Sequence, residues 1–123
     1  MAHTVIFNAE LHIVEIKIQG AYRPAEGKEI LVKTLEMVKA YDCPRTLADM
    51  REAQLKFSMQ ELYRVPNLVR EVATNLGLPP FRKALVVQEL TSEVRFFENV
   101  MLNRGQNVQI FLDIEKAKTW LLR

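Results

Sequence analysis

Hydrophobic and polar residues alternate along residues 12–20, where Val14, Ile16 and Ile18 occupy every second position. A period of two is typical of a β-strand that buries one face. A shorter apolar run at residues 4–7 precedes this segment, and a turn is expected between the two. The chain is therefore predicted to begin with an antiparallel hairpin.

Apolar residues recur at intervals of three or four in the next long segment, residues 23–44, while charged residues occupy the positions between them. This spacing is typical of a helix that buries one face. The same spacing predicts three further helices, within residues 58–80, 91–105 and 113–123.

Short, mostly apolar runs separate the predicted helices and are typical of strands covered on both faces. They lie at residues 45–50, 82–90 and 107–112. After the hairpin, strands and helices alternate, and such alternation requires crossover connections between parallel strands. We therefore expect one α/β domain of order β-β-α-β-α-β-α-β-α. Its sheet has four or five mostly parallel strands and an antiparallel edge.

Composition narrows the class of protein. The 123 residues are 49% hydrophobic, enough for the core of a single domain. The 17 basic and 15 acidic residues are interspersed, so we expect no binding to nucleic acid. No apolar run reaches the ~20 residues of a membrane span, and the first residues do not resemble a signal peptide. With a single cysteine and hence no intrachain disulfide, a cytoplasmic location is expected.

Three segments resemble a known family. They are "LADMR" after the first predicted helix, "KALVV" in the fourth strand and "NRGQNVQIFLDIEKAKTWL" at the end. Together with the element order, they are similar to the small stand-alone bacterial SpoIIAA-like domains. These belong with the STAS-like fold of anti-anti-sigma factors and sulfate-transporter tails. The resemblance implies one STAS-like domain over residues 1–123 and a regulatory or lipid-binding role, because some stand-alone relatives are suspected of binding small apolar molecules.

Anti-anti-sigma factors carry a phosphorylatable serine in an Asp-Ser-Ser-Gly motif at the start of the helix after the third strand. That motif is absent here, and Ser58 is the only hydroxyl near the corresponding helix start. The resemblance therefore implies Ser58 as the candidate phospho-acceptor. Arg51 and Lys56 are close in sequence and suit an anion at a helix N-terminus.

A structural explanation for Ser58 stands beside this one. The sequence "SMQE" is a capping box, in which the Ser58 hydroxyl and the Glu61 carboxylate each accept a backbone N–H of the other residue. The residues alone leave both roles open.

Asp49 and Arg51 are expected at the carboxyl end of the third strand, where ligands gather in open α/β sheets. The pair could bind a polar head group. Alternatively, it forms a local ion pair on the surface, which would have little effect on stability.

Two predicted helices have an apolar surface wider than one stripe. The second helix presents Leu62, Tyr63, Val65, Leu68 and Val69, and the third presents Phe96, Phe97, Val100, Met101 and Leu102. A wide apolar surface packs between neighbouring elements, lines a pocket or docks a partner. Homodimerisation is the simplest explanation, and a pocket for a small apolar ligand is the next.

No catalytic constellation is apparent. Cys43 has no histidine at the spacing of a triad, the two histidines show no metal-binding pattern, and there is no glycine-rich phosphate loop. We therefore expect a non-enzymatic binding or regulatory module without cofactor or metal. It would dock a protein partner after Met50 or enclose a small apolar molecule between the second and third helices. A small hydrolase or transferase is the alternative.

Overall fold

Every predicted segment forms an element in the computed structural model, which describes residues 2–123. The strands are β1 (Ala2–Asn8), β2 (Ile13–Tyr22), β3 (Arg45–Leu55), β4 (Arg82–Val86) and β5 (Val108–Phe111). The helices are α1 (Pro24–Ala40), α2 (Met59–Leu76), α3 (Ser92–Asn103) and α4 (Ile114–Leu121). Their order along the chain is the one that the hydrophobic pattern predicts.

The described strands form one mixed sheet in the order β1-β2-β3-β4-β5. β1 pairs antiparallel with β2, and all other neighbouring pairs are parallel. The expected α/β architecture is therefore observed, with the hairpin strand β1 at one edge. Val14, Ile16 and Ile18 of β2 are buried, as their alternation predicts.

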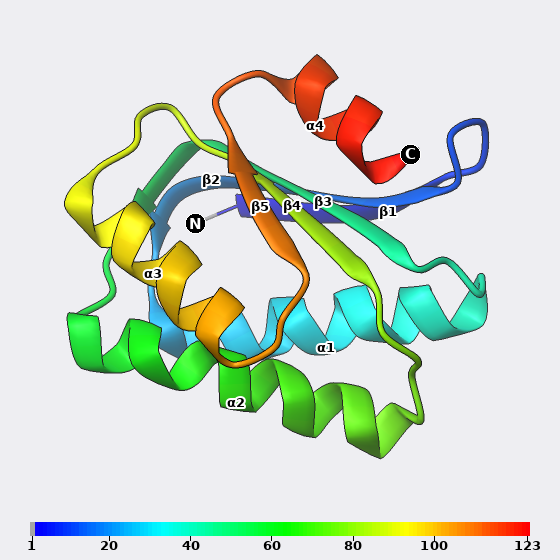
Figure 1. Ribbon diagram of the computed structural model, residues 1–123, viewed down its shortest axis with the longest axis horizontal. Helices are drawn as coiled ribbons and strands as arrows, with labels where there is room; N and C mark the ends of the chain where they lie inside the picture. The colour runs from blue at the N-terminus through cyan, green and yellow to red at the C-terminus, as the bar shows by residue number, and fades with distance from the viewer. Residues whose placement is uncertain (1) are drawn as a thin grey trace.

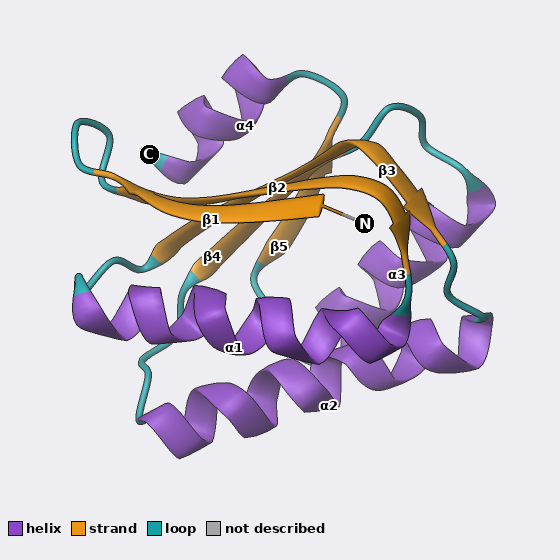
Figure 2. Ribbon diagram, turned by 180° about the vertical axis from the view of Figure 1, so that it is seen from behind, coloured by secondary structure: helices purple, strands orange, loops and turns teal. Residues whose placement is uncertain are grey.

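The helices cover the two faces of the sheet unequally (Figures 1 and 2). α1, α2 and α3 lie on one face and α4 lies on the other. Successive parallel strands are added in one direction across the sheet. Because right-handed crossovers then place each connecting helix on the same face, α1, α2 and α3 gather there. α4 follows the last strand and is free to cover the opposite face.

α2 is set back from the sheet. It packs against α1 and α3, and among the described residues none of its Cα atoms lies within 8 Å of a strand Cα atom. α1 covers β1, β2 and β3, whereas α3 approaches β5. α2 therefore forms a second layer over the other two helices. Only side chains reach into the region between α2 and the sheet.

The opposite face is closely packed. Ile13, Leu47, Val86, Ala117 and Leu121 form a buried cluster beneath α4. Two strand arginines also fix the end of this helix. Arg45 Nε donates to the Leu121 carbonyl oxygen (3.0 Å) and Arg82 Nη1 donates to that of Trp120 (2.6 Å). These bonds satisfy carbonyl groups that have no partner within the helix.

β2 and β3 are longer than the sequence pattern predicts. The third strand was expected to end at Met50, but it continues to Leu55 and pairs with Gln19–Tyr22 of β2. A register shift between Lys17 and Gln19 interrupts the pairing, and Gly20 adopts φ 84°, which favours glycine. The extended pair passes the end of β4 and curves toward the helices (Figure 2).

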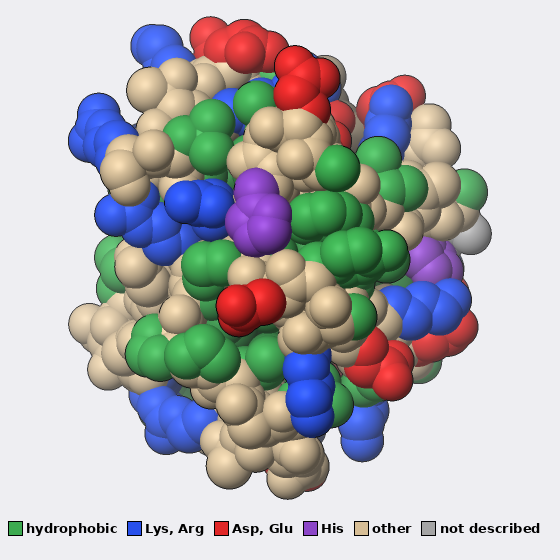
Figure 3. Space-filling view, turned by 90° about the vertical axis from the view of Figure 1, so that its right-hand side faces the viewer, with side chains coloured by type: hydrophobic (Ala, Val, Ile, Leu, Met, Phe, Trp, Pro, Cys, Tyr) green, Lys and Arg blue, Asp and Glu red, His purple; other side chains and the backbone are tan. Residues whose placement is uncertain are grey.

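The surface shown in Figure 3 carries Lys and Arg side chains as well as Asp and Glu side chains, with hydrophobic side chains between them. Neither sign of charge covers this face continuously. Within residues 2–123, no helix combines the length and the apolar composition that crossing a bilayer requires.

Candidate functional site

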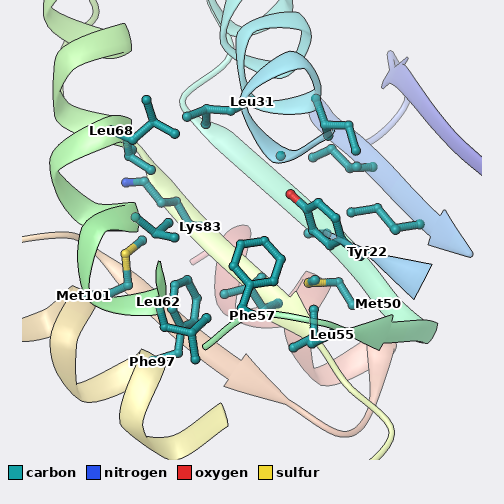
Figure 4. Close-up of a pocket in the computed structure, with 18 of the residues that line it drawn as sticks. Tyr22, Leu31, Met50, Leu55, Phe57, Leu62, Leu68, Lys83, Phe97 and Met101 are labelled. Carbon is teal, nitrogen blue, oxygen red and sulfur yellow. The ribbon is translucent and has the colours of Figure 1, made fainter. Parts of the chain in front are cut away.

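A cavity of about 460 Å³ lies between the sheet and the three helices of the same face. Figure 4 shows side chains from strands and helices converging on it. Its wall is mostly apolar and includes Ile18, Leu31, Met50, Leu62, Leu68, Phe97 and Met101. The volume falls within the ~300–1,000 Å³ typical of ligand sites.

The cavity follows from the position of α2. Protein interiors are normally packed with few voids larger than a water molecule. Here α2 rests on α1 and α3, and side chains such as Leu62 and Val69 point from it toward the sheet without filling the space. The sheet contributes small or medium side chains at its centre, including Thr46 and Ala48 of β3.

One end of the cavity is formed by the extended part of β2 and β3. Tyr22, Leu55 and Phe57 lie there, and the rings of Tyr22 and Phe57 meet edge to face with centroids 5.2 Å apart. Gly27 of α1 makes room for the tyrosine, because a Cβ at this position would stand 3.1 Å from the Tyr22 hydroxyl oxygen. Burial, with a smaller contribution from Glu26, raises the pKa of Tyr22 to about 12, so its hydroxyl stays protonated.

The buried threonine hydroxyls of the wall are already hydrogen-bonded. Thr34 Oγ1 donates to the Ile30 carbonyl oxygen (2.8 Å), and Thr46 Oγ1 donates to the Arg82 carbonyl oxygen (3.3 Å). These donors are therefore not available to a ligand.

Lys83 is a cationic side chain of this mostly apolar wall that lies away from its exposed rim. It is partly buried on β4, and its side chain extends into the cavity toward α2, beside Leu68 and Met101 (Figure 4). Its Nζ donates to the Phe81 carbonyl oxygen (3.2 Å) and lies 3.9 Å from the centroid of the Phe81 ring. Burial lowers the pKa of this amine from 10.5 to about 8.

The structure brings six residues of the two predicted apolar sets into this cavity: Leu62, Val65, Leu68, Val69, Phe97 and Met101. The observed cavity, however, extends further than the pocket predicted between the second and third helices. It lies between these helices, α1 and the sheet, because α2 does not contact the strands directly.

The other four residues of these sets do not line the cavity: Tyr63, Phe96, Val100 and Leu102. Tyr63 is 49% exposed on the outside of α2, where the Arg104 guanidinium lies 4.7 Å from its ring centroid. Phe96 is partly buried and Val100 is buried, and both are absent from the cavity wall. A helical apolar pattern indicates which residues avoid water, but it does not separate the residues facing a cavity from those packed elsewhere.

Asp49 and Arg51 lie within β3 and not in a loop after it, so the predicted position at the strand end is wrong. By alternation they share the face of Leu47, which packs beneath α4, whereas Ala48 and Met50 line the cavity. Arg51 Nε and Nη2 donate to the two Asp49 carboxylate oxygens (2.9 and 2.8 Å). These hydrogen bonds lower the pKa of Asp49. Of the two interpretations of Asp49 and Arg51, a head-group site or a local ion pair, the structure shows the ion pair.

Ser58 forms the capping box at the start of α2. The Glu61 backbone N–H donates to Ser58 Oγ (3.1 Å), and the Ser58 N–H donates to Glu61 Oε1 (2.8 Å). Ser58 is exposed, as is Lys56, whose backbone N–H donates to the Tyr22 carbonyl oxygen (2.9 Å). The cap accounts for the serine, and phosphorylation at this position stays a prediction.

Replacing the cap should weaken the fold measurably. We expect Ser58→Ala to lower the free energy of unfolding by about 1 kcal/mol, because a donor at the start of α2 loses its acceptor. Urea denaturation measures this change, and Ser58→Asp should retain most of the stability. Ser92→Ala is the matched control, since Thr91 and not Ser92 caps α3. An equal loss in both serine variants would contradict the assigned role.

Lys83 and Tyr22 line the cavity but are not among the site residues that the sequence pattern predicts. A signal for Lys83 exists, because alternation in "KALVV" places its side chain on the face of Leu85 and Val87. A lysine on the apolar face of a central strand is unusual and could have been noted. Tyr22 lies beyond the predicted end of its strand, so no local pattern indicated its position.

Other reactive groups do not extend the site. Cys43 is 1% exposed and outside the cavity wall, and its thiol donates to the His12 carbonyl oxygen (3.1 Å). Within residues 2–123, no group of three or more His, Cys, Asp or Glu side chains is placed to hold a metal ion.

No protein-family model matches the chain, and no curated protein matches it significantly.

Proposed function

We propose that this protein is a non-enzymatic, STAS-like binding module that encloses a small apolar ligand between its sheet and α1–α3. One observation carries the proposal: a cavity of about 460 Å³ with a mostly apolar wall. Burial of apolar surface provides about 25 cal/mol per Å² and requires no directional contacts, so such a wall favours apolar molecules of suitable size. The element order and the mixed sheet with one antiparallel edge support the STAS-like assignment.

Docking of a partner protein after Met50 is the competing mechanism within the same class. Its predicted surface is divided by the structure, because Leu62 faces the cavity whereas Tyr63 faces outward. Asp49 and Arg51 bind each other on the opposite face of the sheet. The residues that converge do so around the cavity, and for this reason we favour ligand enclosure.

Binding of a neutral fluorescent apolar probe tests the proposal. We expect N-phenyl-naphthylamine to bind with one site per chain, with enhanced and blue-shifted emission. At a free probe concentration of 100 times the Kd, binding should add about 2.7 kcal/mol to the free energy of unfolding. For a domain of this size, that shift raises the Tm by roughly 10 °C.

Native mass spectrometry of the purified protein provides an independent measurement. A co-purifying apolar molecule of one-to-one stoichiometry would support enclosure and identify the ligand class. If the probe neither fluoresces nor raises the Tm, and no apolar molecule co-purifies, ligand enclosure is ruled out.

A further inference from the structure

We propose that the ligand of this cavity is an apolar molecule carrying a single carboxylate, such as a long-chain fatty acid, and that Lys83 Nζ binds the carboxylate. This inference rests on the proposed function and narrows its ligand class. Apolar walls alone would accept hydrocarbons, alcohols and acids alike, so the head group must be recognised by a polar side chain.

Lys83 is positioned for that role. Its side chain extends from the central strand β4 into the cavity, and its Nζ lies among Leu68, Met101 and the Phe81 ring. An ammonium group has three N–H donors. The structure assigns one of them to the Phe81 carbonyl oxygen, which leaves donors for an additional acceptor.

Within the part of the chain that the structure describes, no carboxylate forms an ion pair with Lys83. Two acidic residues contribute to the cavity wall, but both are engaged at helix starts. Glu61 accepts the Ser58 N–H at the start of α2, and Glu93 is exposed and accepts the Ser92 hydroxyl (3.3 Å). A partly buried ammonium without an anion costs stability, and a ligand carboxylate would relieve this cost.

The charge of the site selects a monoanion. Lys83 is the one cationic side chain of the described wall that is not exposed, since Lys28 and Arg64 lie at its exposed rim. A carboxylate neutralises one ammonium. A phosphate dianion would bring a second charge into the same apolar surroundings without a partner, which is unfavourable at low dielectric.

The head group of a neutral ligand would form weaker hydrogen bonds with this wall than a carboxylate would. The Thr34 and Thr46 hydroxyls donate to backbone carbonyls, so they cannot donate to a ligand head group. Lys83 can donate to an alcohol oxygen, but hydrogen bonds between charged partners are roughly twice as strong as those between neutral groups. The geometry therefore predicts discrimination by head group and not by chain alone.

Displacement of N-phenyl-naphthylamine by dodecanoate, dodecanol and dodecylamine at pH 7 tests the inference on the full chain. We expect dodecanoate to bind tightest and dodecylamine weakest. Lys83→Met should weaken dodecanoate binding by about 10- to 100-fold, as expected for loss of a charged hydrogen bond, and leave dodecanol within a few-fold. Lys83→Arg should retain the preference for the acid.

Lys116→Met is the matched control, because Lys116 is an exposed lysine of α4 on the other face of the sheet. It should bind all three compounds like the wild type. Equal affinity of the wild type for dodecanoate and dodecanol, or unchanged dodecanoate binding by Lys83→Met, would overturn the role of Lys83 and leave the proposed function intact. Failure of every compound and of the probe to bind would instead remove the proposed function, and the inference with it.

Discussion

Lys83→Met should make the folded protein more stable at neutral pH, by up to about 3 kcal/mol. The wild-type ammonium is partly buried among apolar groups, and this lowers its pKa from 10.5 to about 8. A shift of that size corresponds to roughly 3 kcal/mol against the charged form. Methionine has a similar length and no charge to desolvate, so the variant avoids this cost.

The effect should depend on pH in a defined direction. Between about pH 8 and pH 10.5 the unfolded chain holds the Lys83 proton, whereas the folded protein has released it. The unfolded state then binds more protons, so wild-type stability rises with pH across this window. The advantage of Lys83→Met is therefore largest below pH 8 and becomes small above pH 10.5.

Urea denaturation of both proteins at pH 7 and pH 10 measures this difference. Lys116→Met serves as the control and should change the free energy of unfolding by no more than ~0.5 kcal/mol, because Lys116 is exposed. A less stable Lys83→Met variant at pH 7 would mean that the contacts of the ammonium with Phe81 outweigh its desolvation cost, and the prediction would be wrong.

Leu62→Trp should weaken the binding of neutral apolar molecules by more than about tenfold. Leu62 is 5% exposed and its side chain points from α2 into the cavity, so an indole group at this position would occupy space that the ligand needs. We expect the affinity for N-phenyl-naphthylamine to fall by more than about tenfold, the equivalent of losing two buried methylene contacts. Overpacking should cost about 1–3 kcal/mol of stability at most.

Leu102→Trp provides the matched comparison. Leu102 is on α3, is 50% exposed and does not line the cavity, so the same substitution there should leave probe binding unchanged. Fluorescence titration of both variants, with circular dichroism to confirm folding, separates an effect on the cavity from an effect of tryptophan itself. If folded Leu62→Trp binds the probe like the wild type, the binding site lies elsewhere.

Lys83→Met is expected to raise stability and to weaken carboxylate binding, so stability and binding conflict at this position. A methionine at position 83 would avoid the desolvation cost that the lysine carries among these apolar side chains. Stability and function often oppose each other at ligand sites, where polar groups are held ready for a partner. Lys83 fits this pattern if the carboxylate of a ligand completes its surroundings.

Much of the fold is encoded locally. The period of two around Val14 and Ile16 identifies a strand, and the capping box at Ser58 marks the start of a helix. Strict alternation of helices and strands then implies a parallel sheet, since only crossover connections join such strands. The resemblance to STAS-like domains rests on three sequence segments and the order of elements, and it stays a prediction.

The local sequence pattern does not predict features that depend on strand pairing or on packing between residues far apart in the chain. The charged segment after Met50 lacks strand-like alternation, yet it is a strand because the end of β2 pairs with it. That pairing carries Tyr22 and Leu55 to the end of the cavity. Likewise, Tyr63 and Leu62 are both apolar neighbours, and only the packing of α2 determines that one faces outward and the other inward.

The sequence by itself determined which segments begin as helices and strands and in what order, because these preferences depend mainly on residues close together in the chain. The mixed sheet then followed from that order. The tertiary structure alone decided that α2 rests on α1 and α3 without touching the strands. A cavity is the space left between elements, and it depends on distances among residues far apart in sequence. For the same reason, only the fold places Lys83 among apolar side chains of other elements and makes it the candidate anchor for a ligand.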